Sequence, residues 1–320
     1  MTPQSLMKSR VNTAFLVMVL TLGVQSVVSI PATIFTVLAE FGIAVPSYYT
    51  DFVLLQFLYP IGTSLLALIA LRIIKIPVRS LVTIQPIRGD FIPWLGVFLG
   101  VTVGMNYAIN FLLELLARVG IEIPDVFDSY TPQDLPQAIC YFVVLALLPP
   151  ICEEILCRAC VCGLLKHFHP WTAVLISAFA FGMMHATVQQ IPFAFALGVV
   201  LGFVYVKTGN LLYPILFHFV NNVFACLITY LSVWASDEVV SIIGYGADIL
   251  FVLFGIASTL WLIRKRQFTL KEIPHSLSAD EGKTAVLKSP WFWIFTGLYA
   301  GITLLTAVLL TLTETQGIPL

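Results

Sequence analysis

The chain has 320 residues, of which 59% are hydrophobic and only 10% are charged, and its formal net charge is −1. Soluble globular proteins carry about 25% charged residues, so this composition cannot cover a water-facing surface. The same values exclude a disordered chain, a disulfide-rich secreted module and a basic protein that binds nucleic acid. The composition therefore places the chain in a lipid bilayer.

Nine segments are apolar enough, over a length near the roughly 20 residues that a bilayer requires, to be considered as spanning helices. They are residues 13–39, 52–74, 91–117, 138–165, 171–187, 191–207, 211–234, 240–263 and 291–312. Pro31 interrupts the first and favours a kink or a re-entrant turn, whereas the short fifth and sixth segments predict a tight helical hairpin. No segment shows the two-residue alternation of a membrane β-barrel. The sequence predicts an all-α, polytopic transmembrane helical bundle with about eight to nine spans.

Lysine and arginine residues gather in alternate loops of this arrangement. Those on the predicted N-terminal side are Lys8, Arg10, Arg72, Lys75, Arg79, Arg88, Lys166, Lys207, Arg264, Lys265, Arg266, Lys271, Lys283 and Lys288, and Arg118 falls opposite. By the positive-inside rule we expect a multi-pass protein of the cell membrane with a cytoplasmic N-terminus and an external C-terminus. We expect three groups of helices, in residues 1–137, 138–234 and 235–320, with the middle group as the catalytic core.

Polar side chains that are costly inside a bilayer concentrate in three of the predicted spans. The fourth span contains Glu153, Glu154 and Arg158, the fifth contains His185, and the seventh contains His218, Asn221 and Asn222. A charge at the centre of a span costs about 2.5–3.5 kcal/mol on insertion scales. A single intramembrane His or Asn is commonly an interhelical hydrogen-bonding residue, but a cluster of this size favours a functional site.

Helical spacing assigns roles to the acidic motif. Glu154 and Arg158 stand at positions i and i+4, so they share a face and can pair. Glu153 lies about 100° around the helix and has no obvious partner in the sequence. An unpaired carboxylate of this kind suits a general base or acid.

The other polar residues complete a hydrolytic set. His218 and Asn222, also at i and i+4, present two hydrogen-bond donors for a developing oxyanion. His185 would share a water molecule with Glu153. By the predicted boundaries, however, His185 lies near the outer end of its span, while Glu153 and His218 lie deeper.

Three motifs carry a resemblance to a known family: Glu153-Glu154-x-x-x-Arg158, Phe181-x-x-x-His185 and His218-x-x-x-Asn222. They resemble the core motifs of the CPBP intramembrane proteases, which include type II CAAX prenyl endopeptidases and bacterial Abi-type proteins that process bacteriocins or confer immunity. The similarity covers about residues 138–234.

The resemblance implies a membrane-embedded endopeptidase. By this resemblance, Glu153 and His185 would activate water, His218 and Asn222 would stabilise the oxyanion, and Glu154 and Arg158 would shape the site. Cys157 and Ala159 depart from the Phe and Gly that flank this arginine in many members.

Two cofactor hypotheses stay open. Family members are widely described as metalloproteases, and Glu153, His185 and His218 would supply three ligands of a catalytic zinc. A glutamate that binds the metal cannot also be the base, and the H-E-x-x-H pattern of zinc proteases is absent from the sequence. We favour water activated by glutamate without an obligatory metal. The cysteines near the acidic motif are interpreted as packing residues.

The leading hypothesis is an intramembrane endopeptidase that cleaves a membrane-associated peptide or protein, such as a bacteriocin leader. The alternative is a non-catalytic membrane immunity or scaffold protein that binds a peptide in the same cavity, and a third is a transporter that relays protons through Glu153 and Asp248. The expected partners are the substrate and the bilayer, with no nucleic acid. Gly96, Gly100 and Gly104 indicate close helix packing, within the bundle or in a homodimer.

Overall fold

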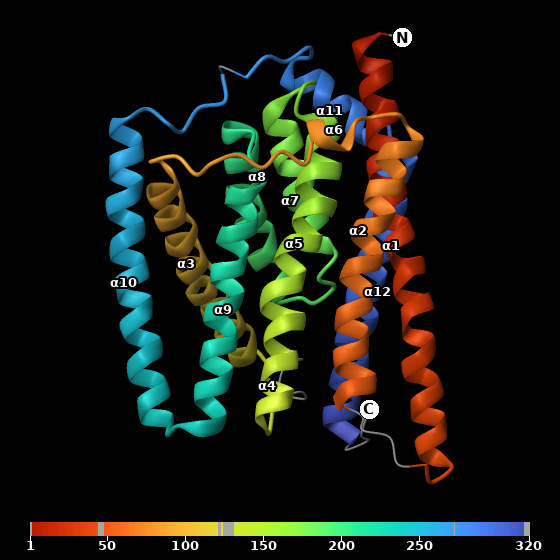
Figure 1. Ribbon diagram of the computed structural model, residues 1–320, viewed down its shortest axis with the longest axis vertical. Helices are drawn as coiled ribbons and strands as arrows, with labels where there is room; N and C mark the ends of the chain where they lie inside the picture. The colour runs from red at the N-terminus through yellow and green to blue at the C-terminus, as the bar shows by residue number, and fades with distance from the viewer. Residues whose placement is uncertain (1, 44–47, 121–122, 124–130, 272, 317–320) are drawn as a thin grey trace.

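A computed structural model of the chain describes residues 2–43, 48–120, 123, 131–271 and 273–316 (Figure 1). The described residues form helices and no strand, and eight helices are long and apolar enough to cross a membrane. The spanning elements are α1 (Pro3–Glu40), α2 (Leu54–Ile73), α3 (Phe91–Arg118), the composite helix Leu135–Leu165, α8 (Gln190–Thr208), α9 (Leu212–Trp234), α10 (Asp237–Arg264) and α12 (Pro290–Gln316). The predicted all-α, multi-pass bundle is confirmed.

The remaining elements are short. They are η1 (Tyr48–Val53), η2 (Val78–Ser80), α7 (Pro170–Met183) and α11 (Ala279–Leu287). The composite helix comprises α4 (Leu135–Tyr141), the π-helical segment η4 (Phe142–Leu147), α5 (Leu148–Glu154), the π-helical segment η5 (Ile155–Cys162) and α6 (Gly163–Leu165). Every residue from Leu156 to Cys162 is buried, so η5 lies at the centre of the bundle.

The first helix is continuous. α1 runs from Pro3 to Glu40 with Pro31 inside it, so no re-entrant turn forms there. A membrane helix tolerates an internal proline when local adjustments satisfy the freed carbonyl groups.

The loops that carry most basic residues lie at one end of the bundle. Figure 1 shows that α1 begins at this end, that α2, α6, α8 and α10 finish there, and that α11 lies beside them. α12 runs from this end to the opposite one. The clustering expected from the sequence is therefore present, and the cytoplasmic position of this end stays a prediction.

The predicted hairpin of the fifth and sixth segments is present, but its first arm is shorter than expected. α7 has 14 residues, about 21 Å at 1.5 Å per residue, which is less than the roughly 30 Å of a bilayer core. Close packing holds α7 against α8, because a Cβ atom on Gly198 would lie 2.9 Å from Cα of Ala178. The segment 171–187 is thus a short helix followed by a turn, and its end lies inside the bundle.

Close packing also joins α3 to α10. A Cβ atom on Gly255 would lie 2.8 Å from Cα of Gly100, so the two backbones touch where neither residue has a side chain. The expected packing role is confirmed at Gly100, whereas Gly104 faces no atom within 4 Å. A homodimer through this strip stays a prediction.

Candidate active site

The helix that carries the acidic motif contains two adjacent prolines. Pro149 and Pro150 follow Leu148 in the first turn of α5. Neither has a backbone N–H, so the carbonyl of Leu145 loses its donor at both i+4 and i+5. Asn222 of α9 replaces it, because its Nδ2 donates to the Leu145 carbonyl oxygen over 2.8 Å. The proline pair thereby fixes α9 against the composite helix.

This explanation predicts that the stability lost on substituting Asn222→Leu depends on the presence of Pro149. The substitution removes the donor to Leu145, and we expect the free energy of unfolding to fall by about 1–3 kcal/mol. Pro149→Ala restores a backbone N–H at i+4, so the double variant should recover most of that loss. Unfolding in detergent would be measured for the wild type, both single variants and the double variant. An equal loss with and without Pro149 would contradict the explanation.

Glu154 lies at the centre of the polar cluster and is fully buried. Its Oε2 is 3.0 Å from Nε of Arg158, and its Oε1 accepts a hydrogen bond from Nδ1 of His218 over 3.1 Å. The side chains of Glu154 and Arg158 are both 0% exposed. The predicted i, i+4 pairing is therefore present, and the same carboxylate also orients the imidazole of α9.

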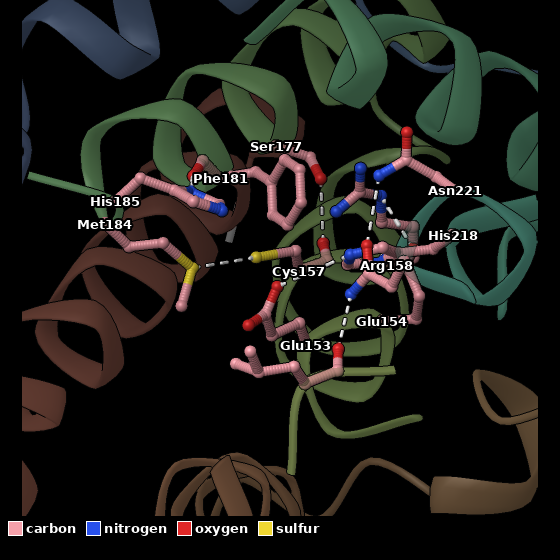
Figure 2. Close-up of polar contacts among 12 residues, drawn as sticks. Glu153, Glu154, Cys157, Arg158, Ser177, Phe181, Met184, His185, His218 and Asn221 are labelled. Atoms are coloured by element: carbon pink, nitrogen blue, oxygen red, sulfur yellow. Dashed lines mark hydrogen bonds and ion pairs between the residues drawn. The ribbon is translucent and has the colours of Figure 1, made fainter. Parts of the chain in front are cut away.

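Phe181 of α7 packs against three of the polar side chains. The Arg158 guanidinium lies 4.3 Å from the centre of its ring, and the rings of His185 and His218 meet it edge to face at 4.9 and 5.6 Å. Figure 2 shows the phenyl ring between His185 and Arg158. Phe181 was not among the predicted site residues. Its position four residues before His185 was the sequence feature that could have indicated it.

His185 reaches the cluster from the turn after α7. Its Nδ1 donates to the carbonyl oxygen of Phe181 over 2.7 Å, so the second ring nitrogen, Nε2, is left for a ligand or a proton. The mismatch in depth expected from the sequence disappears, because α7 ends at Met183 inside the bundle.

The two adjacent glutamates differ in their surroundings. The Glu153 side chain is 18% exposed, and its Oε2 lies 4.0 Å from Nε2 of His218. Glu154 is instead enclosed by its two partners. Glu153 is thus the carboxylate that a water molecule can reach, and it faces the nitrogen of His218 that Glu154 does not use.

The side chains that the structure describes do not gather into a metal site. Among the described residues, no group of three or more His, Cys, Asp or Glu side chains is arranged to hold a metal ion. The nearest side-chain atoms of Glu153 and His218 are 4.0 Å apart, and the ring of His185 meets that of Phe181 edge to face. The neighbouring thiols of Cys152, Cys157, Cys160 and Cys162 are free and buried in the helix. No catalytic step is therefore assigned to a metal.

One comparison with known proteins gives a match that coincides with this site. Residues 135–224 match the family model described as Type II CAAX prenyl endopeptidase Rce1-like. This segment is an Rce1-like domain. It runs from α4 into α9 and contains Glu153, Glu154, Arg158, His185, His218 and Asn222, so the resemblance expected from the three motifs is confirmed. The chain matches no curated protein and no solved structure.

Proposed function

We propose that this chain is an intramembrane endopeptidase whose Rce1-like domain hydrolyses a peptide bond in a membrane-associated peptide or protein. The observation that carries the proposal is the contrast between two adjacent carboxylates. Glu154 is enclosed by Arg158 and His218, whereas Glu153 is partly exposed and faces Nε2 of His218. One acid is thus held as a structural anion, and the other is accessible to act on water.

In the proposed reaction, Glu153 and Nε2 of His185 hold a water molecule, and Glu153 removes one of its protons. The water oxygen attacks the carbonyl carbon of the scissile bond, and the carbonyl oxygen becomes the oxyanion. The proton held by Glu153 then passes to the leaving nitrogen, and the carbon–nitrogen bond breaks. The oxyanion re-forms the carbonyl as this bond breaks. The products are an amine and a carboxylic acid, which gives its remaining proton to the amine or to water, and Glu153 returns to its starting state.

His218 and Asn222 are the proposed donors to the oxyanion. His218 already donates from Nδ1 to Glu154, so it donates from Nε2 only when both ring nitrogens carry hydrogen. Two carboxylates face this ring, Glu154 at Nδ1 and Glu153 near Nε2. Asn222 uses one N–H for Leu145 and retains a second one.

The proposal is tested by incubating the purified protein in lipid nanodiscs with a farnesylated peptide and with the same peptide lacking the lipid. In H₂¹⁸O we expect one labelled oxygen in the new carboxylate, because water is the nucleophile. Binding of the peptide without cleavage would instead support the alternative, a non-catalytic immunity or scaffold protein. Cleavage of both peptides at the same rate would assign the specificity to the peptide and not to its lipid.

A further prediction concerns metal removal. Since the described side chains do not form a metal site, we expect the cleavage rate to stay within about twofold after treatment with EDTA or 1,10-phenanthroline. The measurement pairs the rate with the zinc content of the same preparation. Loss of activity that added zinc restores would contradict water activation by Glu153 alone and would favour the predicted ligands Glu153, His185 and His218.

A further inference from the structure

A basic pocket lies where α2 reaches the end of the bundle that carries the basic loops. Arg72, Lys75, Ile76, Pro77 and Val78 line this shallow pocket, which has a volume of about 340 Å³. Both cationic side chains are exposed. The pocket is separate from the Rce1-like domain, and the proposed reaction does not use any of its residues.

Lys75 lies at the left-handed position that ends α2, and this helix end places it in the pocket. The amide of Ile76 donates to the carbonyl of Leu71 over 2.9 Å, and the amide of Lys75 donates to that of Arg72 over 3.1 Å. This arrangement needs a left-handed residue at position 75, where the observed φ is 58°. Glycine is the usual residue at such a position, so the chain keeps a lysine in a conformation that favours glycine.

An apolar ridge continues from the pocket along α2. Leu65, Ile69 and Ile73 are spaced by four residues and are 52%, 55% and 72% exposed. This spacing places them on one face of the helix, over about 12 Å along its axis. A ligand that fits both features carries an anionic group at one end and a hydrocarbon chain at the other.

We propose that the pocket binds the anionic headgroup of a phospholipid, with an acyl chain of that lipid against Leu65, Ile69 and Ile73. Arg72 and Lys75 contact the phosphate. An anionic lipid meets both requirements in one molecule, because its charge lies at the depth where a spanning helix ends. A basic residue within a Debye length of such a headgroup contributes about 1 kcal/mol to binding.

The chain supplies a matched control at the end of α10. Arg266 is also a cation in a left-handed conformation, with φ of 54°, and its helix end makes the same pair of backbone hydrogen bonds. It does not line the pocket at α2. Figure 1 shows the ends of α2 and α10 on opposite sides of the bundle. A general attraction between basic residues and anionic lipid would involve Arg266 as much as Lys75.

The test titrates the full chain in detergent with phosphatidylglycerol, phosphatidylcholine or inorganic phosphate, and follows the bound lipid by native mass spectrometry and the Tm. We expect phosphatidylglycerol to raise the Tm by about 5 °C at 100 times its Kd. The double variant R72Q/K75Q should bind it about 30-fold more weakly, from about 1 kcal/mol for each charge. R266Q should stay within about twofold of the wild type. K75G, which suits the left-handed backbone, keeps the fold while it removes one charge.

Each outcome decides the proposal. Weaker binding in R72Q/K75Q and K75G, with R266Q unchanged, supports it. Equal losses in R266Q and K75G would show general attraction and would overturn it. Equal stabilisation by phosphatidylcholine would show that the pocket does not prefer a net negative headgroup. Equal stabilisation by inorganic phosphate would show that the pocket binds a free anion and not a lipid.

Discussion

Glu153→Gln is expected to lower the rate of peptide-bond hydrolysis by about 10²–10⁴-fold, the range for loss of a positioned general base. The amide has nearly the same shape as the carboxylate but cannot take a proton from water. Glu153 makes no hydrogen bond to Glu154 or Arg158 in the structure, and its side chain is 18% exposed. The substitution should therefore leave the unfolding transition almost unchanged while it removes the chemistry.

The measurement compares the rate constants of a peptide-cleavage assay with the Tm of the same preparations. Glu114→Gln is the matched control, because Glu114 is a 60% exposed glutamate whose partner is Arg118 on the same helix. It should keep the wild-type rate. Full activity of Glu153→Gln would refute the proposed base. If Glu153→Gln is inactive but binds the peptide as tightly as the active wild type, Glu153 acts in the chemical step and not in peptide binding.

Arg158→Ala is expected to give the largest loss of stability, about 3–5 kcal/mol, because it leaves the buried carboxylate of Glu154 without its cation. The substitution also removes the guanidinium that lies 4.3 Å from the centre of the Phe181 ring. The Glu114–Arg118 pair provides a comparison with the same i, i+4 spacing, but its side chains are 60% and 69% exposed. Arg118→Ala should cost only about 0–1 kcal/mol, since water solvates the carboxylate that remains.

A second substitution distinguishes two causes of this loss, the unpaired charge of Glu154 and the lost packing around Phe181. Glu154→Gln in the Arg158→Ala background removes the unpaired negative charge, so it should restore part of the stability. Chemical unfolding of the four proteins gives the coupling free energy between the two positions. If Glu154→Gln lowers the stability of Arg158→Ala still further, the loss comes from packing around Phe181 and not from the unpaired carboxylate.

Composition and spacing predicted the architecture and the clustering of the polar residues. The low charge content placed the chain in a membrane, and the few charges inside spans indicated Glu153, Glu154 and Arg158 as site residues. The pairing of the last two follows from the geometry of any α-helix, so it could be predicted without knowing the tertiary structure. The partner that Glu154 finds in His218 could not, because it depends on how α9 packs against α5.

The extent of the fifth segment was less predictable. Hydropathy does not distinguish a helix that crosses a bilayer from one that ends inside a bundle, because both are apolar. The hydrogen bond from Asn222 to Leu145 requires two separate facts, a missing backbone donor and a neighbouring helix that supplies one. Only the first can be read from the sequence, in the proline pair at positions 149 and 150.

The short length of α7 has a consequence for motion in the site. Glu153 and His218 are held by helices that continue on both sides of them, whereas His185 stands on a turn whose next residue, Ala186, has a left-handed φ of 54°. A turn can shift without unwinding a helix, so we expect His185 to move more readily than Glu153 or His218 when a substrate binds. We therefore expect the turn from residue 184 to 189 to allow small shifts of His185, while the two helices keep Glu153 and His218 in place.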